Sequence, residues 1–214
     1  MNRLKELSEA LQSGNVDEVK NNINMALDEG ISAGEVLREG LLAGMNIIGE
    51  KFKKDEIFVP EVLISARAMN AGTELLKPIL IEDGEKAIGK ALIGTVKDDL
   101  HDIGKNLVIM MLEGAGFEVV DLGMDVSQND FINAVKKEKP DVLGMSSLLT
   151  TTMPYMEDVI KALEEANLRE GLYVMVGGAP VSNHFAKEIG ADAYAKDAAT
   201  AASFAKESVV GKNQ

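Results

Sequence analysis

The chain has 214 residues, 46% of them hydrophobic, which suits one large domain or two small ones with their own cores. Its formal net charge of −13 argues against a nucleic-acid partner and against an anionic membrane surface, because both are recognised by clustered lysine and arginine. The absence of cysteine excludes disulfides and cysteine-based zinc sites.

The first 80 or so residues have the apolar spacing of helices. The segment 1–11 is charged and amphipathic, without a signal peptide's apolar core, and no run approaches the roughly 20 apolar residues of a membrane helix, so we expect a cytoplasmic protein. Further helices are predicted over 16–27, over 32–52, where Ser32 and Glu35 have capping-box spacing, and from Pro60 at the first helical position. Four helices with short joints predict a bundle domain over residues 1–84.

Residues 82–87 are polar and predict a linker, after which the apolar period changes. Five strand-like runs then alternate with five helix-like segments. The predicted strands are 91–96, 117–122, 141–146, 172–177 and 193–195, and the predicted helices are 103–114, 128–138, 153–166, 181–189 and 197–208. This alternation predicts a flavodoxin-like (Rossmann-like) α/β domain over residues 85–214, with a five-stranded parallel sheet covered on both faces.

The most informative stretch, Asp99-Leu100-His101-Asp102-Ile103-Gly104, follows the first predicted strand. A histidine there is well placed to bind a ligand lying across the end of a sheet. A carboxylate two residues earlier can accept the proton of its other ring nitrogen, as in many metal sites. Gly104 permits close backbone approach by a bulky ligand.

Two further motifs follow in order. Forty-one residues separate Gly104 from Ser146-Ser147-Leu148, and twenty-eight more lead to Gly177-Gly178. Each motif ends a predicted strand, so all three are expected on one edge of the sheet. Asp-x-His-x-x-Gly, Ser-x-Leu and Gly-Gly at this spacing resemble the cobalamin-binding domain of the methionine synthase and methyltransferase family.

This resemblance implies that cobalamin binds with its dimethylbenzimidazole displaced from cobalt (base-off) and with the imidazole of His101 as lower axial ligand (His-on). Asp99 and the hydroxyl of Thr152 would then tune that histidine, and Thr150 would lie near the corrin ring. The implied cofactor-binding set is completed by Asp98, Leu100, Asp102, Gly104, Ser146, Leu148, Gly177, Gly178 and Ala198.

Plainer interpretations stay open for several of these residues. Thr150, Thr151 and Thr152 could form a helix N-cap cluster. The glycine pair 177–178 could simply end a strand. Asp98 stands where the family commonly has glycine, and we expect its carboxylate to face water; Asp102 could equally be a solvated surface residue. His184 matches no motif and is expected to be structural or on the surface.

The helical half also has a counterpart. Residues 44–49, 58–62 and 65–69 resemble the four-helix cap that covers the reactive face of cobalt in methionine synthase. Phe52 and Val59 match the capping phenylalanine and leucine, although Val59 is the smaller side chain. An apolar lid of this kind would exclude water from a reactive metal and would have to move aside for chemistry.

A catalytic barrel alone needs about 250 residues, so a cap and a cofactor domain are all that we expect here. The chain therefore resembles the small corrinoid proteins of methanogens and acetogens. The resemblance implies a methyl-carrier subunit rather than a complete enzyme. Its cofactor would alternate between cob(I)alamin and methylcobalamin, and its partners would be a donor-specific methyltransferase, an acceptor methyltransferase for tetrahydrofolate or coenzyme M, and a reductive activase.

Methanol, methylamines, betaines and methoxylated aromatics all remain open as methyl donors. A cobalamin-dependent sensor or regulator is the main alternative, disfavoured because no basic DNA-binding module is visible. The small subunit of a cobalamin mutase would share the histidine loop, but it would not need the cap-like region 52–69. A flavodoxin-like domain that does not bind cobalamin is the simplest alternative.

Overall fold

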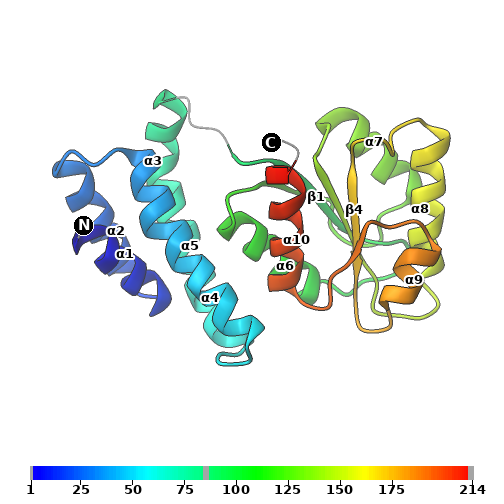
Figure 1. Cartoon of the computed structure of the whole chain (residues 1–214), viewed down its shortest axis with the longest axis horizontal. Coiled ribbons are helices and arrows are strands. Elements are labelled where there is room, and N and C mark those ends of the chain that lie inside the picture. Colours follow the sequence, from blue (N-terminus) through cyan, green and yellow to red (C-terminus); the bar gives the residue numbers. More distant parts are fainter. Residues whose placement is uncertain (1, 84–86, 212–214) are drawn as a thin grey trace. The chain divides into compact units, whose positions relative to one another are not determined.

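The computed structural model describes residues 2–83 and 87–211. The chain divides into two compact units, Met1–Lys86 and Ala87–Gln214. The first is helical and the second holds a parallel sheet with helices, which confirms the predicted fold class. In Figure 1 the colours of the helical unit run from blue into green-cyan, and those of the α/β unit run from green to red. Among the described residues, no helix combines the length and apolar character of a membrane span.

The helical unit begins with α1 (Asn2–Gln12) and α2 (Val16–Asp28). A continuous rod follows, made of α3 (Ala33–Glu35), the π-helical segment η1 (Val36–Leu42) and α4 (Ala43–Lys53). Ser32 begins this rod by accepting a hydrogen bond from the backbone N–H of Glu35, as expected for a capping serine. The core of the unit contains fully buried side chains from each part: Leu7, Leu11, Ile23, Leu41, Met45 and Leu76.

The last helix, α5 (Val59–Asp83), corrects two predictions. The helix begins one residue before Pro60, so Pro60 occupies its second position and not the predicted first. The missing N–H of proline costs nothing there, because backbone N–H groups of the first turn have no intrahelical partner. The predicted linker began at residue 82, but the helix continues past Pro78 to Asp83. Exposed polar residues suit a helical turn as well as a loop, so polarity alone did not locate this boundary. The rest of the predicted linker falls mostly on residues 84–86, which lie outside the described residues.

The sheet of the second unit contains β1 (Lys90–Thr95), β2 (Glu118–Asp121), β3 (Val142–Ser146), β4 (Tyr173–Gly177) and β5 (Ala193–Tyr194). The strands are parallel and lie in the order β2-β1-β3-β4-β5. The connecting helices are α6 (Ile103–Gly114), α7 (Gln128–Glu138), α8 (Pro154–Glu165) and α9 (Asn183–Glu188), and α10 (Ala198–Val210) follows β5. Helix α6 packs beside α10, and α7 packs beside α8, so the two pairs cover opposite faces of the sheet (Figure 1).

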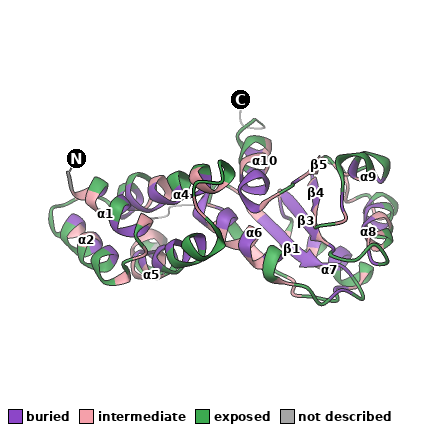
Figure 2. Ribbon diagram, turned by 90° about the horizontal axis from the view of Figure 1, so that it is seen from below, coloured by how far each residue is buried: buried purple, intermediate pink, exposed green. Residues whose placement is uncertain are grey.

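The apolar runs form strands because both faces of this sheet are covered. Figure 2 shows the strands as a largely buried layer between exposed outer helix faces. Leu92, Leu143 and Val174 are fully buried on neighbouring strands, and Phe131 and Ile160 from the helices pack into the same core. The strand order reverses between β1 and β3, so the loops that leave these two strands separate from each other there. In open α/β sheets this is where ligands bind.

Candidate cofactor-binding site

The loop that leaves β1 presents an imidazole held by a buried carboxylate. His101 Nδ1 lies 2.7 Å from Asp99 Oδ1, and the backbone N–H of His101 donates to the same oxygen over 3.1 Å. Because an ionised carboxylate only accepts, Nδ1 carries the proton, and Nε2 of the neutral ring keeps its lone pair. The His101 side chain is 50% exposed while that of Asp99 is fully buried. The free nitrogen is thus positioned to bind a metal from the solvent side.

Asp99 is held in its ionised form. Its second oxygen, Oδ2, accepts from the backbone N–H of Leu148 over 2.7 Å and from the hydroxyl of Thr152 over 2.9 Å. Burial by itself raises the pKa of this carboxyl, but the hydrogen bonds from Leu148, His101 and Thr152 outweigh it and lower the pKa to about 2. Asp99 is therefore a permanent acceptor for the imidazole N–H at neutral pH.

A second hydroxyl extends this arrangement. The hydroxyl of Ser147 lies 2.8 Å from that of Thr152, and both side chains are buried. The alternative of an N-cap cluster does not hold, because Met153 occupies the N-cap position of α8 without a capping side-chain bond. Thr150 and Thr151 are exposed. The sequence placed Ser147 inside a motif but did not assign it a role; its signal was a second hydroxyl beside Ser146.

The two remaining acidic residues of the loop are partnered within the protein. Asp98 is exposed, but its Oδ2 accepts a hydrogen bond of 2.6 Å from the hydroxyl of Tyr155, so it does not simply face water as expected. Asp102 is half-buried at the start of α6, where Oδ2 accepts from the side-chain amide of Asn106 over 3.1 Å.

Large apolar side chains are exposed in the same loops. Leu100 is 70% exposed and Ile103 is 79% exposed, on either side of His101. Leu148 and Leu149 at the end of β3, and Met124 after β2, are also exposed. At Gly104 an added Cβ would meet no atom within 4 Å. The half-exposed imidazole is thus flanked by apolar surface and open space, which suits a large, flat, apolar-faced ligand.

The glycine pair at the end of β4 packs against protein backbone. Gly178 has φ +131°, and an added Cβ would lie 1.8 Å from the carbonyl oxygen of Ser147. At Gly177 the nearest atom would be the carbonyl oxygen of Ala195, at 3.0 Å. Packing against protein backbone is therefore enough to require glycine at position 178 and leaves little room at position 177, and the part of both residues in holding a ligand stays a prediction. Ser146 pairs in register with Gly177, and Ala198 is the buried first residue of α10.

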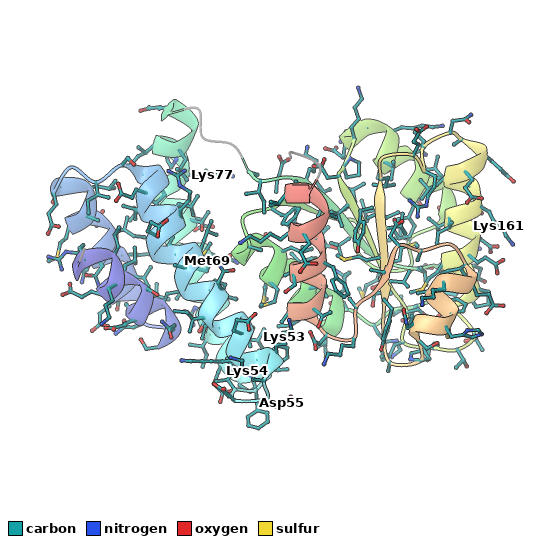
Figure 3. All side chains as sticks on the ribbon, in the orientation of Figure 1. Lys53, Lys54, Asp55, Met69, Lys77 and Lys161 are labelled. Atoms are coloured by element: carbon teal, nitrogen blue, oxygen red, sulfur yellow. The ribbon has the colours of Figure 1, made fainter. Side chains whose placement is uncertain are left out.

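The predicted residues of the helical unit lie at its α4–α5 turn. Phe52 is half-buried near the end of α4, and Val59, the first residue of α5, is 36% exposed. Figure 3 labels Lys53, Lys54 and Asp55 in this turn. His184 is exposed on α9, as expected for a residue without a motif.

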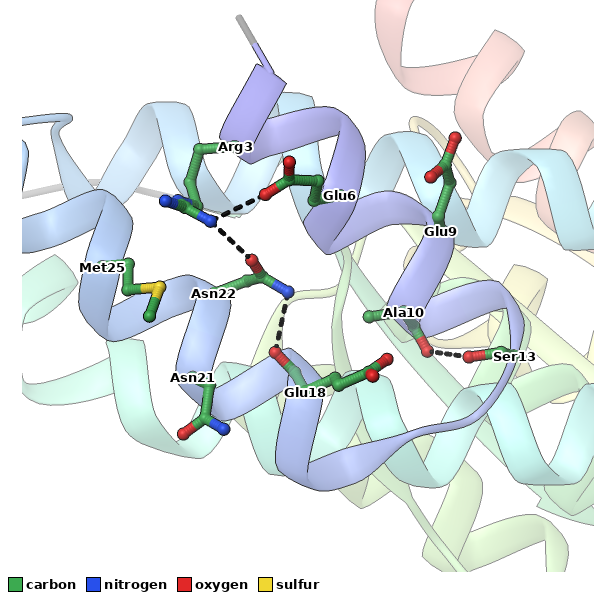
Figure 4. Close-up of a pocket in the computed structure, with 9 residues that line it drawn as sticks. All are labelled: Arg3, Glu6, Glu9, Ala10, Ser13, Glu18, Asn21, Asn22 and Met25. Carbon is green, nitrogen blue, oxygen red and sulfur yellow. Dashed lines mark hydrogen bonds and ion pairs between the residues drawn. The ribbon is translucent and has the colours of Figure 1, made fainter.

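A surface hollow of about 580 Å³ in the helical unit contains none of the predicted residues (Figure 4). It lies along α1 and α2, where Arg3 binds Glu6 over 2.7 Å and Asn22 over 3.3 Å. Across the part of the chain that the structure describes, no group of three or more His, Cys, Asp or Glu side chains could hold a metal ion.

The pKa of Asp99 leads to a stability prediction for the cofactor-free protein. Because the folded pKa of about 2 lies below the ordinary value of 3.8, the stability from ionisation is present above about pH 4 and is lost as the pH falls through 2. Asp99→Asn should therefore lower the free energy of unfolding at neutral pH by about 2 kcal/mol. Urea unfolding, with an osmolyte in the buffer, should show that the difference in unfolding free energy between wild type and variant shrinks from pH 4 to pH 2. A gap independent of pH would contradict this account.

Comparisons with known proteins agree with this geometry. Two models described as a B12 binding domain match residues 3–77 and 89–203. Dimethylamine corrinoid protein 1 of Methanosarcina acetivorans is 42% identical over 205 residues, 95% of this chain and 96% of that protein. The crystal structure of the methanol:cobalamin methyltransferase complex from Methanosarcina barkeri matches with TM-score 0.88 and 31% identity, covering 98% of this chain and 80% of that one. A cobalamin-binding protein from Desulfitobacterium hafniense DCB-2 matches with TM-score 0.80 and 29% identity, covering 96% and 98%.

Proposed function

Because the chain belongs to the family of small cobalamin-binding corrinoid proteins of methyltransferase systems, we propose that it binds cobalamin base-off, with His101 as lower axial ligand, and carries a methyl group between two methyltransferases. The observation that carries the ligand assignment is the hydrogen-bonded series from His101 through Asp99 to Thr152. It begins at a half-exposed nitrogen and ends at a buried hydroxyl, at the point where the strand order reverses.

The residues present fit this cofactor. When bound, cobalamin supplies a cobalt centre that takes a methyl group from a donor and gives it to an acceptor. His101 Nε2 supplies one nitrogen ligand, and imidazole suits such a metal. The exposed side chains of Leu100 and Ile103 offer apolar surface beside the histidine, and the open space at Gly104 leaves room for a broad ring.

The protein's own groups set how strongly His101 donates. Asp99 holds the Nδ1 proton with its ionised carboxylate, which makes Nε2 a better donor. Thr152 and the Leu148 N–H keep that carboxylate in place from the opposite side. Asp99 would accept the Nδ1 hydrogen bond whether or not His101 holds the metal.

Other parts of the proposed site rest on the motif match. We propose that the nucleotide tail lies against Ser146, Leu148, Gly177, Gly178 and Ala198, with Thr150 near the ring and with Asp98 and Asp102 in the loop that borders it. We further propose that Phe52 and Val59 belong to an apolar lid. Phe52→Ala should then leave histidine ligation intact and raise severalfold the rate at which a small alkylating agent reacts with the reduced cofactor in a stopped-flow absorbance assay. An unchanged rate would remove Phe52 from the lid.

The methyl donor and acceptor are proposed from chemistry shared with relatives. Among the relatives and matching structures, one is named for dimethylamine and another for methanol. We propose that a methylated amine or methanol is the donor, held by a first methyltransferase. A second methyltransferase would use tetrahydrofolate or coenzyme M as acceptor, and a reductive activase would restore the reduced cofactor.

The decisive experiment has two stages. Purified protein is incubated with hydroxocobalamin and desalted; a colourless product would end the cofactor assignment. Coloured protein is then reduced and mixed with isotope-labelled methanol or methylamines and each candidate methyltransferase encoded beside its gene. Label that moves to the protein fraction and onward to coenzyme M or tetrahydrofolate supports the carrier role, and label that never enters the protein fraction contradicts it.

A further inference from the structure

The turn before α8 and the first turn of α8 each donate a hydrogen bond to one of two consecutive carboxylates of the β1–α6 loop. Thr152 donates to Asp99 over 2.9 Å, and Tyr155 donates to Asp98 over 2.6 Å. Thr152 lies just before α8 and Tyr155 lies in its first turn, and the Tyr155 N–H donates to the Thr152 carbonyl over 3.1 Å. Of the two contacts, only the one to Asp99 was expected from the sequence.

Asp98 holds a backbone conformation that a residue with a Cβ seldom adopts. Its φ is +61°, in the left-handed region, so its surroundings must hold it there. Its N–H donates to Asp125 Oδ1 over 2.8 Å, and the Asp125 N–H donates in turn to the Asp99 carbonyl over 3.0 Å. The bond from Tyr155 is the third restraint, and it connects Asp98 to α8.

Tyr155 is itself held as a donor. Its hydrogen bond to Asp98 raises the pKa of the phenol, so the hydroxyl keeps its proton at neutral pH. The ammonium of Lys97 lies 5.8 Å from the centre of the Tyr155 ring, within the range of a cation–π contact. The phenol is thus fixed at both its ring and its hydroxyl, beside the residue that precedes Asp99.

We propose that Tyr155 is a positioning residue for the axial ligand: through Asp98 it fixes the loop that carries Asp99 and His101, and so strengthens the bond between His101 and cobalt. This inference rests on the proposed function. Two hydrogen bonds from neighbouring residues at the start of α8 then define the loop: Thr152 orients the Asp99 carboxylate, and Tyr155 fixes the backbone just before it. Tyr155 also holds the Asp98 carboxylate on α8, where it does not compete with Asp99 for the imidazole N–H.

The test measures histidine ligation in protein loaded with cobalamin. The variants are Tyr155→Phe, Asp98→Gly and the double variant. Tyr173→Phe is the matched control, because Tyr173 is the first residue of β4 and therefore lies at the end of the strand away from the predicted site. Nitrogen coupling in the electron paramagnetic resonance spectrum of the cobalt(II) state reports the ligand. An absorbance titration gives the pH at which the histidine leaves the metal.

We expect Tyr155→Phe to lower the ratio of ligated to unligated histidine about threefold to tenfold, the effect of one lost hydrogen bond to a carboxylate. Asp98→Gly should cause the same loss, while its unfolding temperature stays level or rises because glycine tolerates positive φ. The double variant should lose no more than either single variant. Tyr173→Phe should behave as wild type.

The outcomes separate this inference from the proposed function. If wild type shows no nitrogen coupling, the axial-ligand assignment fails and the role of Tyr155 fails with it. If wild type shows coupling and Tyr155→Phe matches Tyr173→Phe, only the role of Tyr155 is overturned. Should Tyr155→Phe not fold, Asp98→Gly decides the matter, because wild-type ligation in that variant overturns the role.

A readout without cofactor is available because the chain has only two histidines. In the cofactor-free Tyr155→Phe protein, the imidazole nitrogen signals of His101 should shift or broaden, while those of His184 on α9 stay unchanged. Identical His101 signals in wild type and variant would contradict a looser loop.

Discussion

His101→Ala is expected to abolish nitrogen ligation of bound cobalt and leave the fold intact. The side chain is half-exposed on a loop, so its removal opens no core cavity. Asp99 keeps its bonds from Leu148 and Thr152 and stays partnered. The nitrogen coupling in the cobalt(II) state should disappear, and the visible spectrum should change to that of a water-ligated cofactor. Loss of a residue that hydrogen-bonds a metal ligand weakens metal binding roughly 10- to 100-fold. Loss of the ligand itself should raise the dissociation constant for cobalamin by more than that.

His184→Ala is the matched control, because it removes the only other histidine, an exposed residue of α9. It should leave spectrum and affinity unchanged. Free imidazole added to His101→Ala should restore nitrogen coupling, since the space and the Asp99 acceptor both remain. An unchanged spectrum in His101→Ala, or a change of equal size in His184→Ala, would remove His101 as the axial ligand.

The period of the apolar residues was enough to predict most of the fold. The predicted helices 103–114 and 128–138 coincide with α6 and α7, because their apolar faces repeat and turn residues bound them. The first predicted strand, 91–96, is displaced by one residue from β1, and the other four are one or two residues too long, since the outermost residues of an apolar run can be buried without pairing in the sheet. The π-helical segment η1 could not be predicted, because its apolar spacing does not differ enough from that of an α-helix.

The site could be predicted where the interacting residues are close in sequence, and not where their contacts depend on tertiary packing. The spacing of Asp99 and His101 indicated their contact, and the end of a strand indicated the edge of the sheet. Tyr155 and Asp125 were missed because they reach the loop only through tertiary structure. In the sequence, Tyr155 is an ordinary aromatic residue near the start of a helix. A carboxylate in a loop, such as that of Asp98, can therefore suggest that a hydrogen-bond donor exists without identifying it.

Gly178→Ala is expected to cause the largest loss of stability. Its φ of +131° is strained for any residue with a Cβ, and the added atom would lie 1.8 Å from the carbonyl oxygen and 2.8 Å from the carbonyl carbon of Ser147. These are backbone atoms, so no side-chain rotation relieves the clash. Backbone strain and overpacking together should lower the free energy of unfolding by about 3 to 5 kcal/mol. Thermal and urea unfolding of the cofactor-free protein measure this loss.

Gly104→Ala separates folding from binding at the same edge of the sheet. Its Cβ meets nothing within 4 Å, and the residue lies in the first turn of α6, so the cofactor-free protein should keep its stability. Its methyl group enters the open space beside His101 and should weaken cobalamin binding. In Gly178→Ala, displacement of Ser147 also disturbs the contact between its hydroxyl and that of Thr152. Ligation of cobalt by His101 should therefore weaken along with stability. If Gly178→Ala unfolds at the same denaturant concentration as wild type, the backbone contact with Ser147 does not define this edge. If Gly104→Ala binds cobalamin as tightly as wild type, the open space beside His101 is not where the ring lies.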